Sequence, residues 1–382
     1  MHDFTDLKCD SLARHLRSHT QAEVRFDATT RKLYSTDASI YQIMPLGVVI
    51  PRTVEDLHTT VQVAAEIGLP IIARGGGTSL SAQSIGAGVI IDCSKYLNQV
   101  LDIDTVGRTV RVQPGVVLDQ LNRTLAPHEL QFGPEVATAS RANLGGMLGN
   151  NSAGSRSIIY GKTVDHVRRL KVLLADGSPA EFGRLSPAEW EQRAELTTTE
   201  GALYRGMRAL ALDHVEEIRQ RFPRILRRVS GYNLDALCRS LTEAAPDQNV
   251  PGLESVLVGS EGTLAVTMEA ELGLVPRPKA RGLLVPHFSS LAAAMDALAA
   301  CLEFKPSAVE LMDHLLLELA RDNLALRGAM APLQGRPAAL FMVEFHGETM
   351  AEVADRVERL RQRLREVAGV TALVPVLDPA QR

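Results

Sequence analysis

The spacing of hydrophobic positions alternates between helical and extended patterns through the first half of the chain. Apolar residues recur on one helical face over residues 54–67. Thr53 and Asp56 form a capping-box sequence at the start of this helix, and Gly68 ends it. The neighbouring apolar runs predict strands at Leu69–Ala73, Val89–Asp92 and Thr109–Gln113 and a helix at Val116–Leu125. Because helices alternate with strands here, we predict a mixed α/β sheet.

The middle of the chain has longer helical stretches. Lys171–Gly177 indicates a buried strand that enters a turn, and Ser186 followed by Pro187 is typical of a helix start. The pattern predicts mostly helix from Pro187 to Leu226, then strands at Ser255–Gly259 and Thr263–Leu272. A cluster of arginines at the end of this stretch and just after it indicates a solvated face or, alternatively, attraction of an acidic substrate: Arg219, Arg221, Arg224, Arg227 and Arg228.

The pattern changes after Pro276-Arg277-Pro278, which we interpret as a domain boundary. The predicted strands beyond it are Gly282–His287, Ala308–Met312, Ala338–Phe345 and Thr371–Leu377. The predicted helices are Ser290–Leu302, His314–Arg321 and Ala351–Ala368, the last with apolar residues at spacings of four and three. Two strand–helix–strand units in succession indicate a ferredoxin-like arrangement.

Composition and charge restrict the class of protein. A chain of 382 residues with 45% hydrophobic content can bury a sizeable core, most simply in two domains. The net charge of −4 gives no reason to expect nucleic acid as a partner. We expect neither a signal peptide nor a transmembrane segment. The four cysteines are widely separated and are expected to be reduced thiols, not disulfides or cluster ligands, and no metal site is predicted.

The most informative chemistry follows the predicted strand at Leu69–Ala73. Arg74 is followed by three glycines and by Thr78 and Ser79, with no helix start at the third glycine. Consecutive glycine N–H groups can form a concave nest for phosphate oxygens, and Arg74 and the hydroxyls could supplement it. A tight loop without a ligand is the alternative, and this stretch alone does not decide between them.

A second segment favours a ligand. Residues Gly133–Arg156 are rich in Gly, Ala, Ser and Asn and poor in bulky side chains, so they cannot form a core of their own. Such a backbone suits close contact with a large, rigid ligand, with Thr138, Asn150 and Asn151 offering hydrogen bonds. A flexible linker is the alternative, but Leu144, Met147 and Leu148 make the segment more apolar than most linkers.

Together with three later motifs, these segments resemble the FAD-binding family of p-cresol methylhydroxylase (PCMH) and vanillyl-alcohol oxidase. The closest branch is that of the D-lactate, D-2-hydroxyglutarate and glycolate dehydrogenases. The resemblance rests on five ordered motifs: the Arg74–Ser81 loop, Leu144–Gly154, Tyr160–Val164, Ser230–Leu234 and Gly259–Val266. It implies an α+β protein with a helical extension at residues 1–41, a two-part FAD-binding domain at 42–276 and an incomplete ferredoxin-like substrate (cap) domain at 277–382.

The resemblance also implies which residues contact FAD. In the family the first loop holds the pyrophosphate, and the later segments surround the isoalloxazine and ribityl groups. The residues carried over are Arg74, Gly75, Gly76, Gly77, Thr78, Ser79, Ser81, Pro134, Glu135, Thr138, Leu144, Gly145, Gly146, Asn150, Asn151, Ala153, Gly154, Gly161, Val164, Glu261, Gly262 and Val266. Some relatives attach the flavin through a histidine in the first loop. This loop has none, so non-covalent FAD is expected.

A second departure concerns the substrate domain. Relatives have histidines and a Glu-His-Gly signature in its later half, whereas Glu344-Phe345-His346-Gly347 has an intervening phenylalanine and lies on an early predicted strand. We therefore expect the chain to be the front portion of a longer enzyme or a shortened relative. Longer relatives have iron–sulfur modules, so an iron–sulfur or quinone-linked partner is one expectation for the electron acceptor.

The leading hypothesis is oxidation of a small D-2-hydroxy acid to the 2-oxo acid, with hydride transfer to flavin N5. Glu310, Tyr232 and Asn233 are the candidates nearest the substrate, and Glu310 is the one able to act as a base outright. The alternatives are a non-catalytic FAD-binding subunit and the reduction of an enolpyruvyl sugar nucleotide by NADPH. A cytoplasmic protein is expected, with peripheral association at the inner membrane left open.

Overall fold

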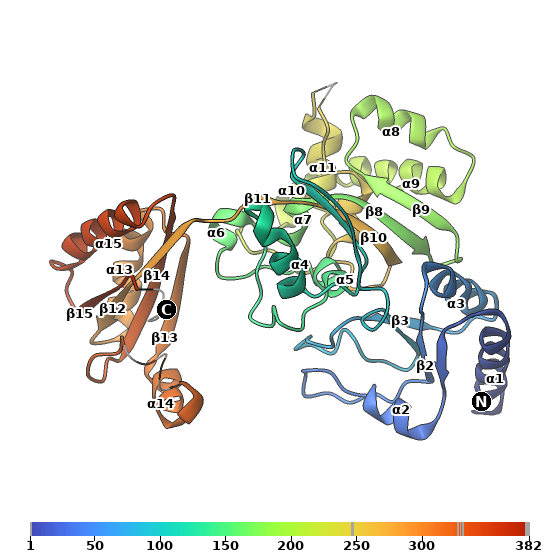
Figure 1. Cartoon of the computed structure of the whole chain (residues 1–382). Helices are drawn as coiled ribbons and strands as arrows, with labels where there is room; N and C mark the ends of the chain where they lie inside the picture. The colour runs from blue at the N-terminus through green and yellow to red at the C-terminus, as the bar shows by residue number, and fades with distance from the viewer. Residues whose placement is uncertain (1, 246–247, 327, 329, 331, 379–382) are drawn as a thin grey trace. The chain divides into compact units, whose positions relative to one another are not determined.

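The computed structural model describes residues 2–245, 248–326, 328, 330 and 332–378. It divides into two compact units (Figure 1). Within the described residues the first unit extends to Gly154 and resumes over Gly161–Val275. The second unit consists of Ser155–Tyr160 and the residues from Pro276 onward. A short segment from the middle of the chain therefore belongs to the second unit.

The first unit begins with a four-stranded sheet in the order β1-β2-β4-β3, in which β2, β4 and β3 are parallel and β1 is antiparallel. The mixed sheet was correctly predicted, as were the capping box of Thr53 with Asp56 and the end of the helix at Gly68, which has a positive φ. Buried apolar residues of α1 and α3 form a core with the sheet. The elements are α1 (His2–His19), β1 (Glu23–Arg25), α2 (Ala28–Leu33), β2 (Gly47–Ile50), α3 (Val54–Glu66), β3 (Ile71–Arg74) and β4 (Val89–Asp92).

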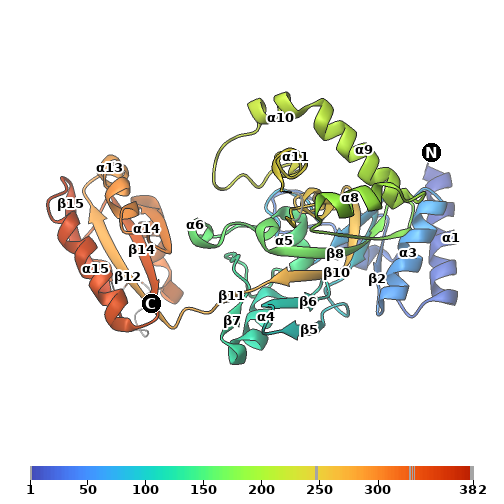
Figure 2. The same ribbon diagram turned by 90° about the horizontal axis from the view of Figure 1, so that it is seen from above.

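A second, wholly antiparallel sheet in the order β5-β6-β10-β8-β9 supports the rest of the first unit (Figure 2). Its strands are β5 (Val100–Asp104), β6 (Thr109–Val112), β8 (Val167–Leu174), β9 (Pro179–Gly183) and β10 (Ala265–Gly273). The helices of this region are α4 (Leu118–Leu125), α5 (Leu144–Asn150), α7 (Thr163–His166), α8 (Pro187–Ala194), α9 (Thr199–Asp213), α10 (Val215–Arg221), α11 (Leu234–Glu243) and α12 (Leu253–Leu257). The short elements η1 (Ala126–His128), β7 (Leu130–Gln131) and β11 (Val275–Pro276) complete it. One large apolar core joins the sheet to these helices.

One predicted element of this region is wrong. Ser255–Gly259 was predicted as a strand, but residues 253–257 form the helix α12. The Glu254 carboxylate accepts the Gly252 N–H at 2.9 and 3.1 Å, which fixes the first turn of this helix. A short apolar run does not distinguish a strand from a buried helical turn.

The second unit is a ferredoxin-like sheet, as the sequence predicted. Its strands are β12 (Ala280–Phe288), β13 (Ala308–Asp313), β14 (Ala339–Gly347) and β15 (Val370–Val376), all antiparallel in the order β13-β14-β12-β15. The helices are α6 (Ser157–Tyr160), α13 (Leu291–Leu302), α14 (His314–Asp322), η2 (Leu324–Leu326) and α15 (Met350–Leu364). Helices α13 and α15 share a core with one sheet face, and Leu317 of α14 packs on the other.

The helices and the cysteines were compared with what the sequence predicted. Among the described residues, we find no helix with both the length and the apolar character that crossing a membrane requires. All four cysteines are buried, free thiols, in agreement with the prediction from their spacing.

Candidate functional site

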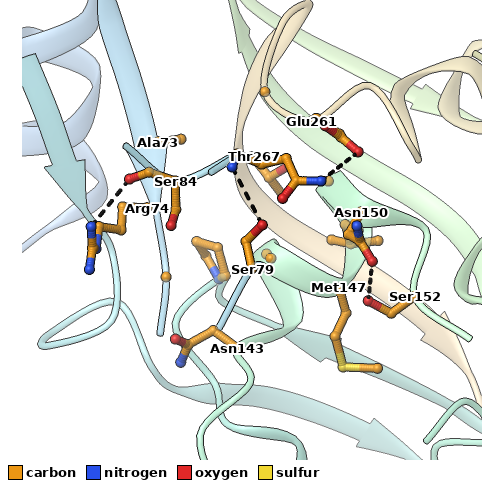
Figure 3. Close-up of a pocket in the computed structure, with 18 of the residues that line it drawn as sticks. Ala73, Arg74, Ser79, Ser84, Asn143, Met147, Asn150, Ser152, Glu261 and Thr267 are labelled. Carbon is orange, nitrogen blue, oxygen red and sulfur yellow. Dashed lines mark hydrogen bonds between the residues drawn. The ribbon is translucent and has the colours of Figure 1, made fainter. Parts of the chain in front are cut away.

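A cavity of the first unit, with a volume of about 370 Å³, lies where the glycine loop, α5 and the turn before β10 meet (Figure 3). The sequence analysis placed three segments far apart in the chain at one ligand, and all three line this cavity. The predicted residues in its lining are Arg74, Gly75, Gly76, Gly77, Thr78, Ser79, Ser81, Thr138, Gly145, Gly146, Asn150, Glu261, Gly262 and Val266.

The glycine loop is packed tightly on its outer side. A Cβ at Gly76 would lie 2.3 Å from the carbonyl oxygen of Arg141, and one at Gly75 would lie 3.0 Å from the Asn143 side chain. Gly77 has φ +64°, a conformation that disfavours other residues. The loop backbone is therefore held against Arg141 and Asn143, with its other side bordering the cavity.

Arg74 does not have the free guanidinium that the sequence analysis assigned to anion binding. Its side chain donates to the carbonyl oxygens of Thr36 at 2.9 Å and of Tyr34 and Ser84 at 3.3 Å. Burial lowers the pKa of Arg74, with nearby Asp92 opposing that shift. The charge of Arg74 thus stabilises the loop, and Figure 3 shows the side chain directed toward Ser84. The guanidinium is oriented this way because three main-chain carbonyl oxygens lie within hydrogen-bonding distance of it.

Helix α5 contributes its backbone to the cavity. Gly145 packs on Pro114, where a Cβ would lie 2.7 Å from the proline Cβ. By contrast, a Cβ at Gly146 or at Gly262 would meet no atom of the described structure within 4 Å. Both glycines line the cavity, so their open sides leave space beside the backbone for a flat ligand.

The turn before β10 is fixed to the end of α5. The Gly259 and Glu261 N–H groups each donate at 2.9 Å, to the carbonyl oxygens of Leu148 and Gly149 respectively. Glu261 has φ +53°, a conformation uncommon for a residue with a side chain. These bonds hold the Gly259–Gly262 turn at the cavity wall.

Two buried oxygens in the cavity lining have no hydrogen-bond donor among the described residues: Asn143 Oδ1 and Gln83 Oε1. The amide groups of these side chains are occupied, with Asn143 Nδ2 on the Gly115 carbonyl and Gln83 Nε2 on Glu261. Buried polar atoms are normally satisfied, so unpaired acceptors in a cavity indicate a ligand with donors. The ribityl hydroxyls and ring N–H of a flavin supply such donors, and the residues present therefore fit FAD.

Eight predicted contact residues lie outside the cavity lining: Pro134, Glu135, Leu144, Asn151, Ala153, Gly154, Gly161 and Val164. Some of them build the wall that the lining residues rest on. Asn151 has φ +53° and accepts the Val164 N–H at 3.0 Å. A Cβ at Gly154 would lie 1.9 Å from the Glu135 carbonyl oxygen. The requirement for glycine at 154 is therefore packing against residue 135.

The three candidate substrate residues do not lie in one unit. Tyr232 is 40% exposed and its hydroxyl is 2.9 Å from Thr263 Oγ1, whereas Glu310 lies on β13 of the second unit. Asn233 is buried, and its amide donates to the carbonyls of Ser255 and Val258 and accepts from Arg228. These bonds occupy the Asn233 side chain in holding the Tyr232 turn.

The sequence analysis missed several lining residues, including Cys93, Gln83, Pro114, Asn143 and Thr267. Gln83 and Asn143 lie next to recognised motifs, and that proximity was the signal available. Burial raises the pKa of the Cys93 thiol to about 12, so this cysteine stays protonated and is a poor nucleophile. That protonation is consistent with a flavin held without a covalent bond.

Comparison with known families agrees with the geometry. Residues 45–183 match the model of the FAD binding domain, and residues 277–382 match that of the C-terminal domain of FAD linked oxidases. Among solved structures, alkyldihydroxyacetonephosphate synthase aligns over 95% of this chain and 61% of its own, with TM-score 0.67 and 17% identity. p-Cresol methylhydroxylase aligns over 96% and 66%, with TM-score 0.66 and 13% identity. These likenesses confirm the PCMH-type fold.

Proteins of similar sequence indicate a narrower group within this fold. The chain is 34% identical over 337 residues to D-2-hydroxyglutarate dehydrogenase of Pantoea ananatis, covering 86% of this chain and 32% of that protein. It is 33% identical to D-2-hydroxyglutarate dehydrogenase of Escherichia coli, covering 88% and 33%. Glycolate oxidase subunit GlcD of Bacillus subtilis is 27% identical, covering 90% and 61%. The chain thus spans about a third of the length of the first of these relatives.

Proposed function

Because the chain belongs to the family of FAD-linked oxidases and dehydrogenases, we propose that it oxidises a small D-2-hydroxy acid to the 2-oxo acid. The observation that supports this most strongly is the cavity lined by three glycine-rich segments. The names of the relatives, D-2-hydroxyglutarate dehydrogenase and glycolate oxidase subunit, support 2-hydroxy acids as the substrate class.

We assign FAD to residues 42–276 and the substrate to residues 277–382. The glycine loop and the Ser79 region would hold the diphosphate, through main-chain N–H groups. Asn143 Oδ1 and Gln83 Oε1 would accept from flavin hydroxyl or N–H donors. When bound, FAD supplies the acceptor for the hydride that leaves the substrate carbon.

The protein residues have the remaining tasks. Oxidation of a hydroxy acid also requires removal of the hydroxyl proton, and Glu310 on β13 is the proposed base. Tyr232, through its exposed hydroxyl beside Thr263, is proposed to orient the substrate. Asn233 acts indirectly, because its amide is occupied in fixing the turn that presents Tyr232.

A second candidate function is that of a flavin-binding subunit that needs another chain for turnover. One observation favours it: GlcD, to which this chain is similar, is itself named as a subunit. An iron–sulfur or quinone-linked module is the proposed electron acceptor in either case. We place the protein in the cytoplasm, with peripheral membrane association as an open part of this proposal.

The test is anaerobic reduction of the FAD-reconstituted protein, followed by flavin absorbance. D-2-hydroxyglutarate, D-lactate and glycolate are added separately, with L-2-hydroxyglutarate as the matched control. Bleaching by a D-acid or by glycolate, and none by the L-acid, supports the enzyme. Stable flavin with no bleaching by any acid supports the subunit. Oxidation of NADPH by the flavoprotein in the presence of an enolpyruvyl sugar nucleotide would contradict both.

A further inference from the structure

Residues 152–163 form a loop whose two ends meet beside the flavin cavity and whose tip belongs to the other unit. At the ends, the carbonyl oxygen of Ser152 accepts from the Thr163 N–H at 3.0 Å and from its hydroxyl at 2.8 Å. Ser152 lines the cavity together with Asn150, to which its hydroxyl donates at 3.2 Å (Figure 3). The tip, Ser155–Tyr160, belongs to the second unit.

The tip is fixed by a buried two-point ion pair. Arg156 donates from Nε to Glu344 Oε2 at 2.7 Å and from Nη2 to Oε1 at 3.0 Å. The side chains are 18% and 11% exposed, so water screens this pair little. Bidentate pairing of a guanidinium with a carboxylate fixes direction as well as distance.

Three further residues complete what we call the tip cluster, defined as Arg156, Tyr160, Arg281, Glu344 and His346. His346 Nε2 lies 3.3 Å from Glu344 Oε1, and the Tyr160 hydroxyl lies 3.4 Å from His346 Nδ1. Arg281 is the register partner of His346 across β12 and β14. Burial raises the pKa of Glu344, but His346 and Arg156 outweigh it and lower the pKa to about 2. Glu344 therefore keeps its charge at any physiological pH.

The connections between the tip cluster and the ends of the loop are short. Only three residues separate Ser152 from Arg156, and two separate Tyr160 from Thr163. A fully extended chain spans at most about 3.6 Å per residue, so these arms reach roughly 14 Å and 11 Å. On the first arm, Gly154 packs directly on the Glu135 backbone, and on the second, Gly161 has φ +70°. The short arms therefore limit how far the tip can move from Ser152 and Thr163.

We propose that residues 152–163 are a tether that couples the substrate unit to the flavin cavity, with Arg156 and Glu344 as positioning residues. The ion pair sets where the tip lies on the ferredoxin-like sheet, and the short arms pass that position to Asn150 and Ser152 at the cavity wall. Neither Arg156 nor Glu344 lines the cavity. The proposal requires FAD in this cavity but is independent of which acid is oxidised.

The test measures FAD affinity and the visible circular dichroism of bound flavin, which reports the ring environment, in a double-mutant cycle. Arg156→Gln and Glu344→Gln are each expected to weaken FAD binding by at least fivefold and to change the dichroism. The double variant should equal the single variants, because either change alone releases the tip. Arg156→Lys, which keeps the charge but loses the second bond, should be intermediate.

Val357→Ala is the matched control. Val357 is buried in the α15 core of the same unit and is not a member of the tip cluster, so its truncation destabilises that unit while leaving the tip-cluster side chains in place. Unchanged FAD binding and dichroism in Val357→Ala are expected. Parent-like values for Arg156→Lys, Arg156→Gln and Glu344→Gln would overturn the tether, as would an equal change in Val357→Ala. A parent protein that binds no FAD would instead overturn the assignment of the flavin site.

Discussion

The flavin cavity and the tip cluster use opposite means to fix a geometry. The cavity is lined mainly by small residues and main chain. The guanidinium of Arg74, which also lines it, donates hydrogen bonds to main-chain carbonyl oxygens. The tip cluster gathers two arginines, a histidine and a tyrosine around Glu344, and the side chains of Arg156, Glu344 and His346 have little exposure to water. A cavity for a large ligand is thus formed by small residues and exposed main chain. A contact that fixes one segment on another is formed by oppositely charged side chains with directional hydrogen bonds. The two regions should therefore respond to different substitutions.

The largest effect on stability is expected from Arg156→Ala. Removing one partner leaves the Glu344 carboxylate buried without its main counter-charge, which typically costs about 3–5 kcal/mol of unfolding free energy. Arg359→Ala is the matched control, because its pair with Asp355 in the same unit is 3.7 Å long and 65% exposed on both sides. That change should cost about 0.5 kcal/mol or less. Urea unfolding of both variants is the measurement, and equal losses would contradict the comparison.

Glu254 is a buried carboxylate of the first unit. Burial raises the pKa of Glu254 from 4.5 to about 7, with the Gly252 N–H opposing that shift. The folded protein therefore binds this proton more tightly than the unfolded chain, and stability falls as the pH rises from 4.5 to 7. Glu254→Gln keeps an acceptor for Gly252 and removes the titration. The variant should be more stable than the parent by on the order of 3 kcal/mol at pH 8. At pH 4.5 the two should be alike.

The check for Glu254 is thermal unfolding of both proteins at pH 4.5 and pH 8. A gain for Glu254→Gln that appears only at the higher pH is the expected result. Equal gains at both pH values would show that packing, and not the charge of Glu254, determines the difference.

Gly146→Ala tests the open backbone of the cavity. The added methyl group meets no described atom of the protein within 4 Å, so the apoprotein should fold as before, but it enters the space assigned to the flavin. We expect FAD affinity to fall by about tenfold or more, or about 1.4 kcal/mol. Gly206→Ala in α9 is the matched control, since its methyl group is equally unobstructed and Gly206 is not among the residues that line the cavity. Isothermal titration with FAD distinguishes the two variants.

The smallest effect is expected from Ser79→Ala. The Ser79 hydroxyl accepts from the N–H groups of Ser81 and Gln83 at 3.3 and 3.4 Å, so its task is to shape the loop. Loss of these long bonds should cost about 1 kcal/mol or less, a roughly fivefold change in FAD affinity. A loss larger than that of Gly146→Ala, measured by the same titration, would mean that side chains dominate the cavity.

Local patterns explain which parts could be predicted. The capping box at Thr53, the helix start at Ser186 and Pro187 and the four strands of the second unit follow from spacing and cap chemistry within a few residues. Tertiary competition explains the failures. The sequence did not indicate that Arg74, which lines the cavity, donates to three carbonyl groups of other segments. The helix α12 forms where a short apolar run indicated a strand, because the Glu254 carboxylate accepts the Gly252 N–H.

The arginines after α9 show the same limit. The sequence indicated a solvated face or attraction of an acidic substrate. In the structure Arg228 is 11% exposed and pairs with Asp235, and Arg227 donates to the Gly154 carbonyl. Membership of Ser155–Tyr160 in the second unit also could not be predicted, since it depends on Glu344, nearly two hundred residues away. Sequence spacing indicates which kinds of group a segment can bind. Which of those groups it contacts depends on the residues that the fold brings next to it.

The most direct test of the account is the absorbance spectrum of the protein after reconstitution with FAD and desalting. We predict flavin bands that remain with the protein through the column and leave on acid precipitation, in the parent and in Gly206→Ala, with marked loss in Gly146→Ala. Circular dichroism of the same samples establishes that each is folded. A folded parent protein that emerges colourless would contradict the flavin site on which the account depends.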